Sequence, residues 1–409
     1  MIALFCVVSL VGHAQGRTLT FEEYLSNVRS SNVSYLAEKY NVDIAEANLK
    51  AAKAFPDPEL SVDYANNQNW DLQMGYGIDA GLSYTLELGG KRRARIRVAQ
   101  SEKELAGAML EDYFRNLRAD ATLAYLAALK QKRLHEIQKT SYRQMLSLSL
   151  ADSLRFRLGA IMEVDARQSK LEAATMLNEV YAGEGEWKQA LVQLSLFQGS
   201  DAMALPDSIT GELSCPKREW ELPALIATAQ NNRADLQAAL QSRELSYNNL
   251  RLAKANRAID LGISIGGVYS SKVLNEIAPA PAFRGITAGI SVPLKFSNAN
   301  KGALRAAQLA ATQSEQQYRA VELQIASEVA QAFSRYTAAC RQVEQFAGLL
   351  DEAEVILQKK VYSYERGETT ILEVLNAQRT YNDVQVNHSE TLYHCAAAMV
   401  ELERACGNL

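Results

Sequence analysis

The chain of 409 residues is 48% hydrophobic and 22% charged, and its formal net charge is −4. This composition supplies ample material for a folded core, and the small negative charge excludes a typical nucleic-acid binder. After the N-terminus, no apolar run approaches the roughly 20 residues that a membrane helix needs. Any membrane span would therefore have to be made from strands.

The N-terminus has the pattern of an export signal. Residues 2–11 are almost wholly apolar, and they lead into the mostly small residues 12–16, which suit signal-peptidase cleavage. We therefore expect residues 1–16 to be a signal peptide. No lysine or arginine precedes Arg17, which leaves a misplaced start site or a cytoplasmic chain as alternatives. The residues before Cys6 form a poor lipoprotein signal, so a lipid anchor is not expected.

Period-2 alternation marks the strands. Leu60, Val62 and Tyr64 alternate with polar neighbours, and the same pattern predicts strands at about 59–67, 74–88, 260–271 and 283–296. Segments of this length suit strands that turn apolar side chains towards lipid and polar side chains towards a lumen. An amphipathic sheet in a soluble protein is the alternative.

Long helices fill most of the rest of the chain. No proline occurs in 59–205 or in 294–409, so these stretches are free to form continuous helix. We predict long helices at about 91–158, 160–196, 301–366 and 370–406. Between Leu304 and Ala353 apolar or small residues recur every seven positions, which predicts a coiled-coil seam.

Glycines mark the ends of the two longest predicted helices. Gly367 follows a basic residue directly and Gly159 lies one place from one, and glycine is the usual residue of a left-handed helix cap. A further helix of about 35 residues is predicted after each glycine. The sequence therefore predicts two helical hairpins.

The chain also contains an internal duplication. Residues 30–60 align without gaps with 231–261 at an offset of 201, as in Asn48 and Asn249, and a second block matches at an offset of 208, as in Gly81 and Gly289. A supersecondary unit used twice explains this repetition. We predict a first repeat at 17–205, a linker at 206–222 and a second repeat at 223–409.

Each repeat would contribute two strands and one long helical hairpin. Four strands cannot close a useful pore, and an open sheet edge in lipid would leave backbone groups unpaired. We therefore expect a mainly α fold with a transmembrane β portion, completed by other copies of the chain. Three copies would form a 12-stranded β-barrel continuous with a 12-helix α-barrel.

The cysteines and histidines do not form a recognisable metal or catalytic motif. After the signal, the cysteines are Cys215, Cys340, Cys395 and Cys406, which lack zinc spacing and are too few for a disulfide scaffold. Cys340 and Cys395 lie almost equally far from Gly367, so a hairpin would bring them together as packed thiols or, alternatively, as a disulfide. His388 and His394 do not share a helix face well, and we expect no metal or cofactor.

Essentially the whole mature chain resembles the TolC-type outer-membrane efflux channels. The stretch Leu86–Arg92, LELGGKR, is similar to the strand-to-helix junction of outer-membrane components in cobalt-zinc-cadmium efflux systems, and Ser291–Leu294 is the matching junction. The resemblance implies a homotrimer in the outer membrane whose helices extend into the periplasm. It further implies contacts with outer-membrane lipid, a periplasmic adaptor and an inner-membrane RND-type pump, together with passive conduction and no catalytic centre.

The resemblance places the functional residues at the hairpin tips. The candidates for adaptor contact are Arg155, Leu158, Gly159, Tyr364, Arg366 and Gly367. The pattern after Gly367 resembles the segment whose two acidic residues constrict the closed aperture. Glu373 occupies the first acidic position, whereas Asn376 departs from the second, and the first repeat offers Glu163 and Asp165. Three copies of Glu373 around an axis would repel one another and attract cations.

The alternatives to a channel are an enzyme and a periplasmic coiled-coil scaffold or adaptor. An enzyme is not expected, because the chain has no phosphate-binding glycine loop, nucleophile elbow or paired metal motif. A periplasmic coiled-coil scaffold or adaptor would not need lipid-length alternating strands. Within the channel class, heavy-metal cation efflux is the preferred reading, and multidrug efflux or type I protein secretion is the alternative.

Overall fold

The computed structural model describes residues 18–68, 73–201, 205–294, 300–346 and 348–408. It divides into two compact units. The hairpin unit comprises Met1–Glu38, Asp112–Arg233 and Leu323–Leu409, and the sheet unit comprises Lys39–Glu111 and Ala234–Glu322. Each unit draws on both predicted repeats, so neither repeat is a separate compact body. The predicted signal peptide lies outside the described residues.

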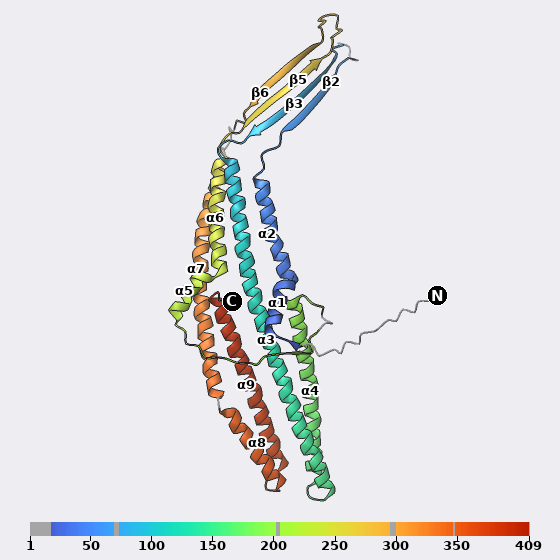
Figure 1. The fold of residues 1–409 in the computed structure, drawn as a ribbon, viewed down its shortest axis with the longest axis vertical. Coiled ribbons are helices and arrows are strands. Elements are labelled where there is room, and N and C mark those ends of the chain that lie inside the picture. The colour runs from blue at the N-terminus through green and yellow to red at the C-terminus, as the bar shows by residue number, and fades with distance from the viewer. Residues whose placement is uncertain (1–17, 69–72, 202–204, 295–299, 347, 409) are drawn as a thin grey trace, which may run out of the picture. The chain divides into compact units, whose positions relative to one another are not determined.

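Four antiparallel strands form the sheet of the sheet unit (Figure 1). They follow the order β2-β3-β5-β6, and their bounds are β2 Glu59–Asn66, β3 Tyr76–Leu86, β5 Leu261–Ser270 and β6 Phe283–Ser291. The central pair, β3 and β5, joins one repeat to the other. The fourth strand, predicted to reach residue 296, ends at Ser291; residues 292–294 are described but lie outside it, and residues from 295 are not described.

The strand register separates apolar from polar side chains. Val62 lies opposite Ala80, and Leu82 lies opposite both Leu60 and Ile265. Because side chains alternate along a strand, this register gathers on one face Leu60, Val62, Tyr64, Ile78, Leu82, Ile263, Ile265, Ile286 and Ile290. The opposite face carries mainly serines, glycines and aspartates. The alternation predicted from the sequence is thus a two-faced sheet.

Helices complete the sheet unit. It contains α6 Ala234–Ala255 and parts of α2 Val33–Ala52, α3 Lys91–Arg157 and α7 Lys301–Phe346. Leu49 and Ala52 of α2 are buried in one cluster with Ala99 of α3. The small side chains let the two helix backbones approach closely, as expected for a coiled coil.

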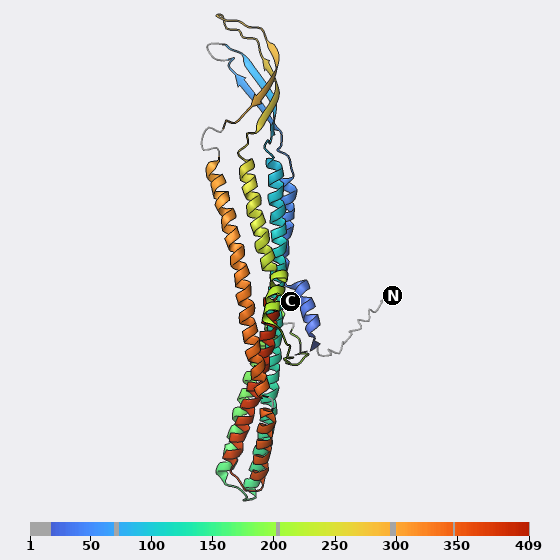
Figure 2. The ribbon, with the colours of Figure 1, turned by 90° about the vertical axis from the view of Figure 1, so that its left-hand side faces the viewer.

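The hairpin unit is built around two helical hairpins (Figure 2). The first joins the later part of α3 to α4 Glu163–Gln198, and the second joins α8 Leu349–Glu365 to α9 Ile371–Ala405. The remaining elements are α1 Phe21–Ser31, α5 Leu222–Asn232, β1 Thr18–Leu19 and β4 Ser208–Ile209. Their core includes Met145 and Met176 of the first hairpin and Ile371 and Leu375 of the second.

The expectation of one continuous helix over 301–366 is corrected by the structure. The helix is divided into α7, which ends at Phe346, and α8, which begins at Leu349. Gly348 between them has φ 89°, a left-handed conformation that is incompatible with continued α-helix. The predicted seam is nevertheless packed, because Ala311, Ile325 and Ala353 are all buried. None of the helices in the described ranges is both long and apolar enough to span a bilayer.

Candidate functional site

Both hairpins turn at glycines that adopt left-handed conformations. Gly159 has φ 73° and Gly367 has φ 78°. The amide of Ala160 donates to the carbonyl of Arg155, and the amide of Glu368 donates to the carbonyl of Ser363. These bonds satisfy carbonyls that each helix end would otherwise leave unpaired. The same capping geometry therefore closes both tips.

A buried polar contact joins the two hairpins beside these turns. The hydroxyl of Tyr364 on α8 donates to Asp152 Oδ1 on α3 at 3.0 Å. Asp152 is fully buried and Tyr364 is 5% exposed. Arg155 lies 3.8 Å from the same carboxylate oxygen and also donates to the main-chain carbonyl of Glu365. We call Asp152, Arg155, Tyr364 and Glu365 the tip clasp.

The buried surroundings of the Asp152 carboxyl group in the tip clasp disfavour its ionised form. Burial raises the pKa of Asp152 above its ordinary value, while the Tyr364 hydroxyl and the Arg155 charge oppose that rise. Burial and the neighbouring Asp152 carboxyl together raise the pKa of Tyr364. The tyrosine therefore stays protonated and remains a hydrogen-bond donor to Asp152.

Asp152→Asn is expected to stabilise the protein at neutral pH. Because the folded-state pKa of Asp152 is raised above the ordinary 3.8, the folded protein binds more protons than the unfolded one just above that value. The stability of the unmodified protein consequently falls as pH rises through this window. Thermal unfolding should show a stability advantage for Asp152→Asn at neutral pH that vanishes below pH 3.8. The exposed Asp383→Asn serves as the control, and an equal effect in both variants would contradict this reasoning.

The predicted gate residues are engaged within their own hairpins. Glu373 at the start of α9 forms an ion pair with Lys360 on α8, and this hydrogen-bonded lysine lowers the Glu373 pKa in the single chain. Glu163 accepts a hydrogen bond of 2.7 Å from Arg167 one turn later. Asp165 is half-buried and Asn376 is exposed. The four residues do not form one cluster within a single chain.

The predicted adaptor-contact residues differ in their exposure. Leu158 is 74% exposed, and Arg366 stacks over the ring of Tyr362 with its guanidinium 4.2 Å from the ring centroid. Tyr364 and Arg155 instead belong to the tip clasp, so the Tyr364 side chain does not present a surface. Sequence reasoning missed Met162 and Val164, whose side chains are 73% and 68% exposed beside the first turn.

Sequence reasoning also missed Asp152 and a second bridge between the hairpins. Arg379 Nη2 on α9 donates to both carboxylate oxygens of Glu172 on α4, at 3.1 Å to Oε1 and 3.0 Å to Oε2. Such two-pronged pairing fixes geometry as well as charge. The only sequence signal for either bridge was a charged residue next to a predicted hairpin, which does not identify its partner.

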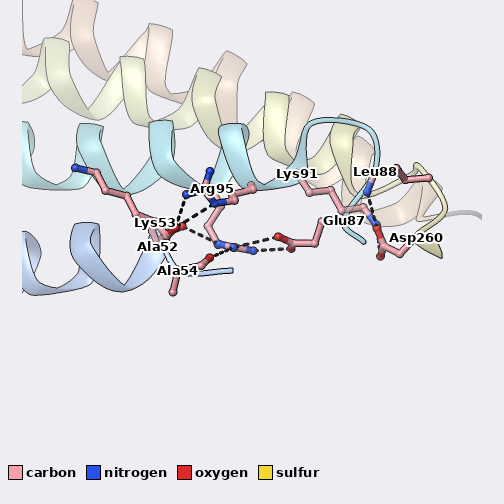
Figure 3. Close-up of polar contacts among 9 residues, drawn as sticks. Ala52, Lys53, Ala54, Glu87, Leu88, Lys91, Arg95 and Asp260 are labelled. Carbon is pink, nitrogen blue, oxygen red and sulfur yellow. Dashed lines mark hydrogen bonds and ion pairs between the residues drawn. The ribbon is translucent and has the colours of Figure 1, made fainter. Parts of the chain in front are cut away.

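The LELGGKR stretch forms a junction between strand and helix in the sheet unit (Figure 3). Arg95 binds the Glu87 carboxylate at 2.7 Å and donates to the main-chain carbonyls of Ala52 and Ala54. Lys91 binds Asp260 at 2.5 Å, and Asp260 also accepts from the Leu88 amide. These contacts tie β3, α2 and α3 to the start of β5. The charged residues of this motif thus have structural partners.

The predicted approach of Cys340 to Cys395 is confirmed by their Sγ separation of 3.6 Å, but the predicted bonding requires a correction. Cys395 forms a disulfide with Cys215, whereas the sequence had paired it with Cys340 as a packed thiol or a disulfide. Cys340 keeps a free thiol, and its Sγ lies 3.6 Å from Cys395 Sγ. Cys215 comes from the predicted linker, and nothing in its sequence position indicated that this segment returns to α9.

Comparison with known proteins agrees with this architecture. A profile of the outer membrane efflux protein family matches residues 24–200 and 225–408. The chain is 22% identical to the cobalt-zinc-cadmium resistance protein CzcC of Cupriavidus metallidurans, covering 95% of this chain and 90% of the relative. It is 25% identical to the pyoverdine export outer membrane protein OpmQ of Pseudomonas putida, covering 81% and 70%.

Solved structures show the same fold. The CmeC outer membrane channel of Campylobacter jejuni superposes with a TM-score of 0.77 at 15% identity, covering 95% of this chain and 85% of that one. The TolC-type fold predicted from the sequence is therefore confirmed.

Proposed function

The chain belongs to the outer membrane efflux protein family, and on that premise we propose that it conducts heavy-metal cations out of the cell. It is an efflux channel of the outer membrane and not an enzyme. In our proposal a periplasmic adaptor and an RND-type pump of the inner membrane deliver the cargo, and the channel supplies a passive route.

The two-faced sheet is the observation that carries this proposal. Its apolar face is open to the surroundings, as Ile286 at 85% and Ile290 at 75% exposure illustrate. Large exposed apolar patches are unusual in soluble monomers and mark contact with lipid or protein. Alternation between a lipid side and a polar side is what a strand crossing the outer membrane requires. A soluble scaffold or adaptor would have no use for such a face.

The same sheet favours association of identical chains. Within the described residues, β2 and β6 each pair with only one neighbouring strand. Their outer edges would leave backbone donors and acceptors unpaired in lipid, at a cost of several kcal/mol per group, on the order given for apolar media. Pairing of β2 with β6 of another copy removes this cost. We therefore propose a homotrimer, as the resemblance to TolC-type channels implies.

We assign the gate to the hairpin tips. The tip clasp fastens one hairpin to the other through the buried Tyr364–Asp152 hydrogen bond and the bond from Arg155 to the main-chain carbonyl of Glu365. Opening the tip would require these groups to separate. The exposed Leu158, Met162 and Val164 beside the first turn provide an apolar contact surface for an adaptor, whose binding could offset the cost of opening.

Charge on the polar face supports cationic cargo. Asp63 of β2 lies directly opposite Asp79 of β3, and both are exposed. Like charges opposite each other destabilise a sheet by roughly 0.2–1 kcal/mol, so their presence calls for a functional reason. In a trimer the carboxylates would form rings that attract cations. The similarity to CzcC agrees with this cargo. The LELGGKR stretch does not support a metal cargo, because its charged side chains are paired with other residues at the strand-to-helix junction.

The similarity to the pyoverdine export protein OpmQ favours a second cargo class, an organic compound such as pyoverdine or a drug. Purification from membranes in detergent, followed by mass determination and planar-bilayer recording, tests the channel itself. A conducting trimer is expected, and a soluble, non-conducting monomer would refute the channel.

The ion selectivity of the channel tests the cargo. A preference for cations over anions that falls in the Asp63→Asn, Asp79→Asn double variant would support cationic cargo. Unselective conductance would favour the organic alternative.

Glu373→Ala is expected to increase the leak conductance of the purified channel. The substitution removes the α8–α9 ion pair with Lys360 and, in a trimer, one acidic position at the aperture. Single-channel recording in the absence of an adaptor measures this leak conductance. Glu184→Ala, which loses an ion pair with Lys188 within α4 away from the tips, is the comparison. Unchanged conductance in Glu373→Ala would remove this residue from the gate.

A further inference from the structure

Three sulfur atoms from three separate segments meet in the hairpin unit. Cys215 comes from the segment between β4 and α5, Cys340 from α7 and Cys395 from α9. Their Sγ atoms all lie within 4.8 Å of one another. Cys395 is buried, and the other two are half-buried. The disulfide uses only two of these sulfurs, so the third has no covalent role.

The segment that carries Cys215 is held in place by contacts other than the disulfide. The Tyr336 hydroxyl on α7 donates to the carbonyl of Pro216 at 3.2 Å and accepts from the amide of Arg218 at 3.1 Å. Lys217 pairs with Glu344 of α7 at 2.7 Å. These bonds hold the residues immediately after Cys215 against α7.

The same segment is also fastened to α9. Arg218 pairs with Glu403 of α9 at 3.1 Å, while the ring of Trp220 packs 5.2 Å from that of Tyr336 on α7. Reduction of the disulfide would therefore leave Cys215 beside Cys340 and Cys395. The three thiols would remain an assembled set of ligands.

We propose that the reduced cluster of Cys215, Cys340 and Cys395 binds one thiophilic metal cation. Thiolates are the ligands that cations such as Zn²⁺, Cd²⁺ and Cu⁺ select. At a metal–sulfur distance of about 2.3 Å, three sulfurs around one ion are separated by roughly 3.8–4.0 Å. The Cys340–Cys395 distance of 3.6 Å and the overall limit of 4.8 Å lie close to this geometry. The Cys215 and Cys395 sulfurs must move apart from their bonded separation of about 2 Å once the disulfide is reduced.

The bound cation would neutralise most of the charge of the cluster. Three thiolates and one divalent cation carry a net charge of −1, and the neighbouring Lys217 and Arg218 are already paired with Glu344 and Glu403. Among the described residues, no histidine or carboxylate completes the cluster. The fourth position of a tetrahedral ion would therefore be taken by water or by a ligand from solution.

Oxidation and metal binding exclude each other at this site. In the disulfide state the Cys215 and Cys395 sulfurs are bonded to each other, and only the Cys340 thiol is left. A phosphine reductant cleaves the disulfide to two thiols and becomes a phosphine oxide with an oxygen atom from water. Binding of the cation then displaces the protons of the thiols to solvent. This inference does not depend on which cargo the channel conducts.

Cadmium titration tests the proposal on the full chain in detergent. A Cys6→Ser, Cys406→Ser background leaves only the three cysteines of the cluster. After reduction with a phosphine and its removal without air, one Cd²⁺ per chain should bind and produce thiolate-to-cadmium charge-transfer absorption. The unreduced protein should give no such band at the same Cd²⁺ concentration.

Cys340→Ser in this background keeps the Cys215–Cys395 pair and thus serves as a folded variant. After reduction its affinity for Cd²⁺ should be more than about 100-fold lower, since loss of even an outer-shell partner costs 10–100-fold. Circular dichroism and oligomer mass verify that it is folded. Absence of a one-to-one band in the reduced background, or a band that Cys340→Ser leaves unchanged, would overturn the proposal.

Discussion

A channel carrying Tyr364→Phe is expected to leak in planar bilayers without an adaptor or pump. The substitution removes the hydroxyl that donates to the fully buried Asp152 and keeps the ring in the hairpin core. A hydrogen bond to a charged group contributes about 1.5–3 kcal/mol. Because each 1.4 kcal/mol is tenfold in an equilibrium, the open population should rise roughly 10- to 100-fold.

Tyr362→Phe is the matched control for this prediction. Tyr362 lies one helical half-turn away, is 53% exposed, and stacks under Arg366 through its ring. Its replacement removes a hydroxyl from the same helix without affecting the tip clasp. Equal leak in the two variants would show that the Tyr364–Asp152 hydrogen bond does not hold the tip closed. Oligomer mass confirms that both variants assemble.

Gly89→Ala is expected to prevent or strongly destabilise folding of the sheet unit. Gly89 has φ 71°, a conformation that costs an alanine roughly 1–2 kcal/mol. A Cβ at this position would also overlap the Cβ of Ala258, and overpacking of this kind adds about 1–3 kcal/mol. Thermal unfolding of detergent-purified protein, together with the yield of assembled channel in membranes, measures the loss.

The neighbouring glycine separates the two causes. Gly90 has φ 72°, but a Cβ there meets no atom within 4 Å. Gly90→Ala should therefore show only the conformational cost. A Gly89→Ala, Ala258→Gly double variant should recover part of the lost stability, because it removes the overlapping methyl group. If Gly89→Ala and Gly90→Ala were equally destabilised, the close approach to Ala258 would not be the reason for glycine at 89.

Features encoded within one element were predictable from the sequence. The alternation in 59–67 and 283–296 predicted strand faces, and Gly159 and Gly367 predicted turns, because each depends on local backbone and side-chain geometry. Gly348 shows the limit of such reasoning. Gly107 lies inside the continuous helix α3, whereas Gly348 interrupts the predicted helix. Both are glycines in helical surroundings, and a Cβ at either would meet no atom within 4 Å, so neither the local sequence pattern nor the space around them distinguishes the two.

Contacts between distant segments were not predictable. Asp152 and Tyr364 are separated by 212 residues, and a lone aspartate in a long amphipathic helix is most often solvated. Cys215 and Cys395 are separated by 180 residues, and one of them belongs to a segment with no periodic pattern. Helical spacing could pair Cys340 with Cys395, but it contained no information about the path of the linker.

The polar face of the sheet is lined by very small side chains. Its opposed pairs include Ser61 with Gly81, Gly266 with Thr287 and Ser264 with Gly289. In the assembled channel the bore at this level would be set by the backbone, with the carboxylates of Asp63 and Asp79 as its main chemical features. Such a wall sorts solutes by charge and scarcely by size. If the hairpin tips form the gate as proposed, exclusion of bulky molecules would fall to them, and an enlarged cargo would demand changes there while leaving the strands untouched.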